Sequence, residues 1–283
     1  MKVLVTGSSG GVGRYVVEEL KDYHHIVGYD LVPPTDIVGA PAKYVRGDIL
    51  DLGALIWAMQ DVEGVIHLAA IPNPFNDPPL RIIDVNVRGT YCVLEAARLA
   101  GVRKVVMASS DSALGFTFRY RDFLPEYLPI DERHPLKPQE AYCLSKLLGE
   151  EICWACSRAT DMEIIALRIC HILFPAKLQQ YRDLISDSSH FARGLWVYTH
   201  VQDSAKAFRL ALEVKGISGE AFFIAAKDLL SREKTLDLIR QYYPGVEKVD
   251  RERLQGYNSL INCQKAETML GYQSLLSWRD CLK

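Results

Sequence analysis

The chain has 283 residues, of which 49% are hydrophobic and 24% are charged, and its formal net charge is −2. This balance is typical of a globular protein whose core needs no disulfide or structural metal, and it disfavours nucleic acid or an anionic membrane as a partner. We expect no membrane segment, since no apolar run is long enough, and the N-terminus reads as a strand rather than a signal peptide. Seven scattered cysteines favour a cytoplasmic protein with free thiols.

Short β-branched runs alternate with longer helical patterns in the first half of the chain, which predicts parallel strands joined by helices. We expect strands at Lys2–Val5, Ile26–Tyr29, Lys43–Val45, Val65–Leu68, Lys104–Met107, Glu163–Leu167 and Ala221–Ala225. We expect helices near Gly11–Lys21, Leu52–Met59, Leu80–Ala100, Glu140–Arg158, Val201–Val214 and Ser231–Tyr242. The pattern predicts an α/β fold of the Rossmann type, built on a doubly wound parallel sheet.

Two segments interrupt this alternation. Phe116–Pro138 holds four prolines and is predicted to be a long loop, and Ile172–Trp196 is predicted to be irregular. We therefore expect a Rossmann domain over residues 1–170, with a later strand and helix from about 199–226. Residues 171–198 and 227–283 are expected to form a small C-terminal lobe over the strand ends, where a substrate would bind.

A glycine-rich turn joins the first expected strand to the first expected helix. Gly7, Gly10 and Gly13 stand three residues apart, which permits a tight turn and a close approach of backbone to a pyrophosphate. The helix N-terminus would attract the phosphate anion. A plain turn is the alternative, but the flanking strand and helix favour a dinucleotide cofactor bound by the turn residues Gly7, Ser9, Gly10, Gly11, Val12 and Gly13.

Asp30 closes the second expected strand. A carboxylate there can accept hydrogen bonds from ribose hydroxyls and would repel the 2′-phosphate of NADP. Leu31, Val32 and Pro33 follow, so that no basic side chain is ready for that phosphate. The sequence therefore predicts NAD as the cofactor; the alternative is a surface turn aspartate.

Tyr142 and Lys146 stand four residues apart in an expected helix, which places them one turn apart on one face. We expect the ammonium to lower the pKa of the phenol, as an acid/base acting on a hydroxyl or carbonyl requires. Ser109 and Ser110 end a buried strand, where parallel sheets bind ligands. Taken alone, each signal also fits an exposed helix pair or ordinary loop serines.

Cys153 and Cys156 form a C-x-x-C pair inside the same expected helix. We interpret them as buried helix residues rather than redox or metal-binding groups, because no second pair of cysteines or histidines lies nearby in the sequence. We expect no metal site.

As a set, these motifs resemble the extended short-chain dehydrogenase/reductase family, which includes NAD-dependent sugar epimerases, dehydratases and dehydrogenases. The resemblance covers roughly residues 1–170 and adds the segments Gly47–Asp48, His67–Ala70 and Asn86–Thr90. It implies that Ser110, Tyr142 and Lys146 are catalytic, and that Lys146 also bonds the nicotinamide ribose. It further implies cofactor contacts at Asp48, Ile49, Leu68, Ala69 and Ala70, a supporting role for Asn86, and a homodimer formed through the helices near Leu80–Ala100 and Glu140–Arg158.

Within that family the sequence is most similar to uronate dehydrogenases, which oxidise free sugar acids. Two of its differences from that subfamily leave carboxylate recognition open. Asp111 and Ser112 replace its Asn-His pair, and its arginine cluster is missing apart from Arg182. Substrate contacts are expected from Ser110, Asp111, Ser112, His171 and Arg182; Lys177 or Arg119 could replace Arg182, or all three could be solvated surface charges.

Three functions remain open at this point. The first is a dehydrogenase that moves a hydride between NAD and a sugar or sugar acid. The second is a nucleotide-sugar epimerase with tightly held NAD, which is disfavoured because Trp196 stands where those enzymes carry a diphosphate-binding arginine. The third, a non-enzymatic NAD(P)-sensing or scaffold protein, is disfavoured by the intact Ser110, Tyr142 and Lys146.

Overall fold

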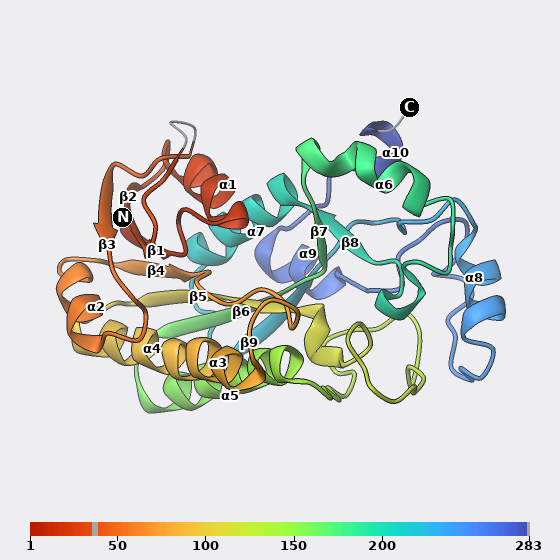
Figure 1. Cartoon of the computed structure of the whole chain (residues 1–283), viewed down its shortest axis with the longest axis horizontal. Coiled ribbons are helices and arrows are strands. Elements are labelled where there is room, and N and C mark those ends of the chain that lie inside the picture. Colours follow the sequence, from red (N-terminus) through yellow and green to blue (C-terminus); the bar gives the residue numbers. More distant parts are fainter. Residues whose placement is uncertain (36–38, 282–283) are drawn as a thin grey trace.

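A seven-stranded parallel sheet forms the centre of the molecule in the computed structural model, which describes residues 1–35 and 39–281 (Figure 1). Its strand order is β3-β2-β1-β4-β5-β6-β9. The strands are β1 (Lys2–Thr6), β2 (His25–Asp30), β3 (Lys43–Arg46), β4 (Gly64–His67), β5 (Lys104–Ser110), β6 (Glu163–Ile169) and β9 (Glu220–Ile224). The order reverses between β1 and β4, and such a reversal opens a crevice at the carboxyl ends of those strands. The predicted Rossmann-type fold is confirmed.

Helices cover both faces of this sheet, as Figure 1 shows. α1 (Gly11–Leu20) and α7 (Val201–Glu213) pack on one face through apolar side chains such as Val16 and Phe208. α2 (Leu52–Ala58), α4 (Gly89–Leu99) and α5 (Ala141–Ala159) pack on the other through Leu55, Val93 and Cys153. Each helix buries one apolar stripe, so the sheet is sandwiched between two hydrophobic layers.

The helix predicted near Leu80–Ala100 is confirmed, and it contains one π-helical turn that was not predicted. α3 (Pro79–Ile83) leads into a π-helical turn at Asp84–Arg88, and α4 follows. The Asn86 side chain bonds the backbone of Ile71 on one side and the Ser145 hydroxyl on the other. These bonds fix the Asn86 side chain between the Ile71 backbone and α5. π turns of this kind are often found at functional sites.

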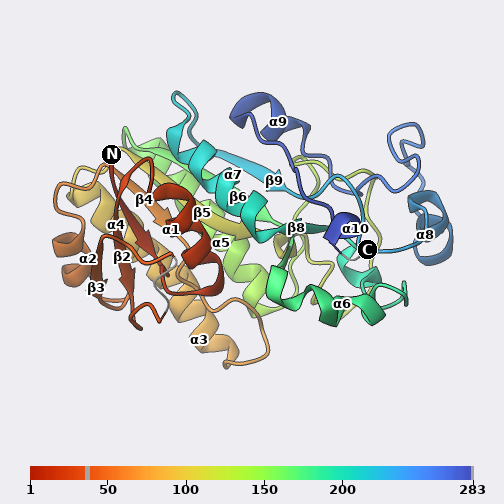
Figure 2. The ribbon, with the colours of Figure 1, turned by 90° about the horizontal axis from the view of Figure 1, so that it is seen from above.

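The C-terminal part of the chain adds a second, smaller layer beyond the strand ends, visible to the right in Figures 1 and 2. It contains a two-stranded parallel sheet of β7 (His171–Leu173) and β8 (Tyr198–His200). Its helices are α6 (Leu178–Leu184), α8 (Thr235–Tyr242) and α10 (Trp278–Cys281), whereas α9 (Gln264–Leu270) packs beside α7 and β9 on the central sheet. The prediction that Ile172–Trp196 is irregular is therefore wrong in part, since β7 and α6 are too short for a periodic sequence pattern.

The long loop predicted at Phe116–Pro138 is confirmed, since no regular helix or strand lies between Leu114 and Ala141. Phe116, Leu128 and Ile130 of this loop enter the same apolar cluster as Trp196 and Leu238. The expected C-terminal lobe thus shares its apolar core with this loop. The predicted boundaries between the Rossmann domain and the lobe remain a prediction. Within residues 1–35 and 39–281, no helix is both long and apolar enough to span a bilayer.

Candidate active site

Two cavities meet at the carboxyl ends of the central strands. The first, of about 470 Å³, is lined by Ser110, Tyr142 and Lys146 and extends to His171. The second, of about 600 Å³, is lined by Gly7, Asp30 and Asp48. Leu68 and Ala70, which follow β4, line both. The glycine-rich turn and the Ser-Tyr-Lys group therefore border one continuous crevice, at the point where the strand order reverses.

Glycine is required at two positions of the turn between β1 and α1. Gly7 has a φ of +71°, and a Cβ there would lie 2.7 Å from the backbone nitrogen of Ala69. A Cβ on Gly13 would lie 2.1 Å from the Gly7 carbonyl oxygen. Because both contacts involve backbone atoms, any larger residue would displace the turn from the strand end. The first glycine shapes the turn, and the last lets the helix pack against it.

The turn also offers donors that suit a phosphate. The hydroxyl oxygens of Ser8 and Ser9 are buried and have no hydrogen-bond partner within the described residues. The N-cap of α1 is Gly10, which has no side chain to satisfy the first backbone N–H groups. Unpaired hydroxyls and N–H groups at a helix N-terminus fit an anionic group. This part of the crevice therefore fits the pyrophosphate of a dinucleotide.

The other residues predicted to contact the cofactor distribute along the crevice. Asp30 accepts hydrogen bonds from the backbone N–H groups of Ser9 (3.0 Å) and Val32 (3.2 Å), which orients its carboxylate at the cavity wall. Lining the second cavity are Gly7, Ser9, Gly10, Asp30, Asp48, Ile49, Leu68, Ala69 and Ala70, whereas Val12 lines the first. Gly11 and Gly13 lie in the first turn of α1 and line neither cavity, and Asn86 borders a small void together with Lys146.

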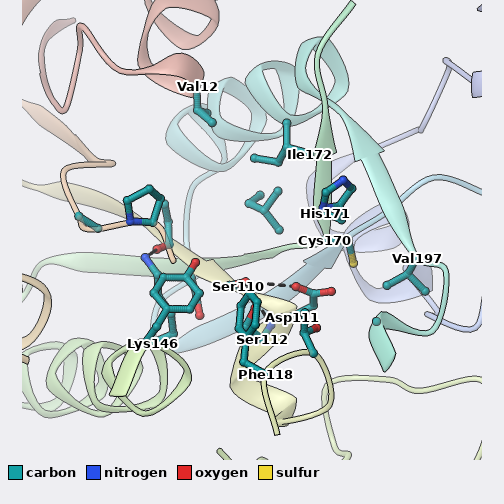
Figure 3. Close-up of a pocket in the computed structure, with 18 of the residues that line it drawn as sticks. Val12, Ser110, Asp111, Ser112, Phe118, Lys146, Cys170, His171, Ile172 and Val197 are labelled. Carbon is teal, nitrogen blue, oxygen red and sulfur yellow. Dashed lines mark hydrogen bonds between the residues drawn. The ribbon is translucent and has the colours of Figure 1, made fainter. Parts of the chain in front are cut away.

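Ser110, Tyr142 and Lys146 all line the first cavity, and Ser110 and Lys146 are labelled in Figure 3. Ser110 ends β5, and its hydroxyl donates toward the Asp111 carboxylate (3.1 Å) and the Ser112 hydroxyl (3.0 Å) and accepts the Ser112 backbone N–H at 3.1 Å. Lys146 donates to the Ala108 carbonyl oxygen at 3.0 Å, and its Nζ lies 5.7 Å from the centre of the Tyr142 ring. The predicted spacing thus places three polar groups together beside the crevice.

The electrostatics of this group differ from the expectation for Tyr142. Burial raises the pKa of the Tyr142 phenol above its ordinary value, and the bond from Ser110 opposes this. The predicted lowering by Lys146 is not found in the protein alone, since the ammonium is aimed at the Ala108 carbonyl. Burial also lowers the pKa of Lys146 to about 8, against the field of Glu150. Tyr142 is thus the neutral phenol at neutral pH, ready to donate a proton.

The predicted substrate contacts divide into two groups. Asp111, Ser112 and His171 line the first cavity together with Ser110, and Figure 3 shows His171 across the cavity from Lys146. Burial raises the pKa of Asp111 to about 7. Arg182 is exposed on α6 and lines neither cavity.

Neither alternative to Arg182 lines these cavities. Arg119 pairs with Asp122 at 2.7 Å and donates to the Phe116 carbonyl. Lys177 lies over the Phe174 ring. Carboxylate recognition by any of the three basic residues is thus unsupported by their positions.

Several lining residues were missed because they come from the two irregular segments. Phe118, from the long loop, packs edge-on against Tyr142 with ring centres 5.9 Å apart. His190, Phe191 and Arg193 line the far side of the cavity. Their loops have no local periodicity that ties them to Tyr142, so neither spacing nor pattern could have identified them.

Cys153 and Cys156 lie on α5 as predicted. Cys153 is fully buried with its Sγ 3.5 Å from the Met107 sulfur, and Cys156 is partly buried. Among the residues the structure describes, no cluster of three His, Cys, Asp or Glu side chains could hold a metal ion.

Comparisons with known proteins agree with this geometry. A model of the NAD-dependent epimerase/dehydratase family matches residues 3–225. A putative UDP-glucose 4-epimerase of Methanocaldococcus jannaschii is 30% identical over 99% of this chain and 96% of its own. A uronate dehydrogenase of Pseudomonas putida is 29% identical over 59% of this chain and 60% of its own. The crystal structure of a short-chain dehydrogenase/reductase superfamily protein from Agrobacterium tumefaciens with bound NAD is 26% identical, with a TM-score of 0.76 over 100% of this chain and 95% of that one.

Proposed function

Since the chain belongs to the NAD-dependent epimerase/dehydratase family, we propose that it is a dehydrogenase that transfers a hydride between a sugar or sugar acid and the nicotinamide. The chain is an enzyme of this family, and NAD is its cofactor. The observation that carries the proposal is the meeting of Ser110, Tyr142 and Lys146 at the floor of a cavity continuous with the glycine-rich turn. The main task of the protein in such a site is to position the substrate and the cofactor, because bound NAD supplies the hydride chemistry.

Each of the three residues has a distinct part in the proposed reaction. The Ser110 hydroxyl holds the substrate oxygen beside the Tyr142 phenol, which lines the same cavity. Tyr142 exchanges a proton with that oxygen: the neutral phenol donates it during reduction, and oxidation requires Tyr142 first to lose its proton so that the phenolate can take one from the substrate. Lys146, anchored on the Ala108 carbonyl, holds positive charge near the phenolate and would bond the nicotinamide ribose. Asp30 would bond the adenosine ribose, and Ser9 the pyrophosphate.

The substrate end of the cavity favours a small polyhydroxylated molecule. Asp111, Ser112 and His171 provide polar groups, while Phe118 and Val197 provide apolar walls. Hydroxyl-rich rings present both kinds of surface, with polar edges and apolar faces. A screen of NAD reduction with uronic acids, aldoses and small alcohols tests the substrate class, and we expect turnover with at least one sugar or sugar acid.

The catalytic assignment is tested with Tyr142→Phe, which keeps the ring and removes the proton. We expect it to reduce kcat by about 10²–10⁴-fold, the usual contribution of a positioned acid/base, with little change in NAD affinity. Phe118→Leu serves as the control for altered packing against Tyr142. Turnover by Tyr142→Phe at the parent rate would remove Tyr142 from the mechanism.

An epimerase remains the alternative. It would keep NAD through purification, so cofactor absorbance that survives dialysis would favour it over a dehydrogenase. Trp196 is buried, and its indole N–H is bonded to the Ser188 carbonyl, so it offers no cation to a nucleotide diphosphate. We expect dialysis to remove the cofactor.

The proposed dehydrogenase is cytoplasmic. All seven cysteines are free thiols, including Cys281 on the surface. Unpaired thiols on several elements suit a reducing compartment.

A further inference from the structure

A buried ion pair lies beneath the catalytic helix, next to Lys146 but outside the residues that face the cavity. Glu150 follows Lys146 by one turn of α5, and its side chain is 1% exposed. Its two carboxylate oxygens accept bonds from Arg168 Nε (3.0 Å) and a terminal guanidinium nitrogen (2.8 Å). The Ser109 hydroxyl donates to the same carboxylate at 2.5 Å. Removing a carboxylate from water costs free energy, so we expect the buried Glu150 carboxylate to have a role beyond packing.

The ion pair ties the catalytic helix to the strand that carries Ser110. Two consecutive residues of β5 each hold one residue of α5. The Ala108 carbonyl accepts from Lys146, and the Ser109 hydroxyl donates to Glu150, while Ser110 and Tyr142 line the first cavity beside them. Arg168 sits opposite Ser109 in the register of β5 and β6, which places its guanidinium at the same level. These bonds fix the height of the helix over the strand and hence the position of Tyr142 over Ser110.

The charge of Glu150 also acts on Lys146. Burial disfavours the charged ammonium form of Lys146, and the negative charge of Glu150 counteracts this effect of burial. His67, from β4, also faces Lys146, but its own burial lowers its pKa to about 3, so it carries no charge at neutral pH. Tyr142 faces Lys146 from the same helix as a neutral phenol, and Asp111 acts on Tyr142 from beyond it. Arg168 lies on the far side of the ion pair, bound to Glu150.

We propose that Glu150 is a positioning residue for this reaction: its buried carboxylate, held by Arg168 and Ser109, keeps Lys146 in its ammonium form and fixes the catalytic helix over Ser110. This rests on the proposed function, because it assigns Glu150 to the same site. Glu150 touches neither cavity and acts through Lys146.

The test is the titration of Lys146 in Glu150→Gln, a variant that keeps the shape of the side chain and removes its charge. Lysines carrying ¹³C at Cε report their own protonation by NMR, and Lys146→Arg identifies the Lys146 signal. We expect Glu150→Gln to lower the midpoint of the Lys146 titration by about one pH unit, a roughly tenfold shift toward the amine. The alkaline limb of the kcat/KM profile should move down by the same amount.

Ser109→Ala is the matched control, since it removes one bond to Glu150 and keeps the charge. It should leave the Lys146 midpoint in place. If Glu150→Gln does not fold, the double variant Glu150→Gln/Arg168→Gln places two neutral amides together and leaves no unpaired charge. It should show a smaller fall in the Lys146 midpoint, because it removes the opposing positive charge of the more distant Arg168 together with the negative charge of Glu150.

An unchanged Lys146 midpoint in either glutamine variant would overturn the inference, even if that variant were less stable to heat. The NMR titration needs no substrate. If no sugar or sugar acid is oxidised, the proposed function fails while the Lys146 titration still tests Glu150.

Discussion

The Asp111 carboxyl keeps its proton up to an unusually high pH, and the stability of the protein therefore depends on pH. Burial raises its pKa from 3.8 to about 7, so the folded protein binds this proton more tightly than the unfolded chain does. Stability from this group is complete below the unfolded pKa and is lost as pH rises from about 4 to about 7. We expect Asp111→Asn, which cannot ionise, to raise Tm by a few degrees relative to the parent at pH 8 and by less at pH 5, measured by calorimetry.

The control for Asp111→Asn is Asp187→Asn. Hydrogen bonds from Ser189 lower the pKa of the Asp187 carboxyl, so the neutral amide should lower Tm slightly at pH 8. An equal gain in Tm by Asp111→Asn at both pH values would mean that burial does not penalise the Asp111 carboxylate.

For Asp30 we expect a different role, the selection of NAD over NADP. Its carboxylate is oriented by Ser9 and Val32 at the wall of the second cavity. Replacing it with alanine removes charge-assisted bonds to ribose hydroxyls and also removes the repulsion of a 2′-phosphate. We expect Asp30→Ala to weaken NAD binding about tenfold and to reduce the ratio of NAD affinity to NADP affinity. Calorimetric titration with each cofactor measures both affinities. Asp22→Ala, an exposed change outside both cavities, should alter neither affinity.

Among the elements, the π-helical turn at Asp84–Arg88 depends most clearly on one side chain. Asn86 satisfies both the N–H and the carbonyl of Ile71, and it also bonds the Ser145 hydroxyl on the catalytic helix. Asn86→Ala would leave these partly buried groups unpaired, which we expect to cost about 2–3 kcal/mol in the free energy of unfolding. Urea denaturation measures the loss. Asn73→Ala, in the exposed loop before α3, should cost well under 1 kcal/mol, and a similar cost for both would assign no special role to the turn.

The same element scale shows what could be predicted from the sequence. The β1–α1 turn and the Tyr142–Lys146 pair are local patterns, in which spacing along the chain fixes spacing in the fold. The π turn could not be predicted, because Ile71 and Ser145 dictate it from other elements. Phe118 and the Glu150–Arg168 pair were missed for the same reason: their partners lie far away in sequence. Local chemistry is thus readable from the sequence, whereas the walls of the cavity depend on tertiary contacts.

For the whole molecule, the face formed by α3, α4 and α5 exposes large apolar side chains. Leu80 is 84% exposed, Tyr91 57% and Leu144 39%, and α5 packs against both other helices (Figure 1). Exposed apolar side chains gathered on neighbouring helices suit a protein interface, and we propose that this face pairs two copies of the chain as a homodimer. Sedimentation should then give twice the 31.9 kDa mass of one chain.

A two-fold interface presents every substitution twice, so one charge placed near the axis meets its own copy across the interface. Tyr91→Glu adds two buried carboxylates to an apolar contact, each of which loses hydration without gaining a partner. We expect this variant to sediment as a monomer at concentrations where the parent is a dimer. Tyr23→Glu is the matched control: Tyr23 is 60% exposed and follows α1 on the opposite face of the sheet, where the charge should leave the dimer intact. If Tyr91→Glu and the parent sediment alike, the pairing surface must lie elsewhere, because two unpaired carboxylates in this contact could not leave the mass unchanged.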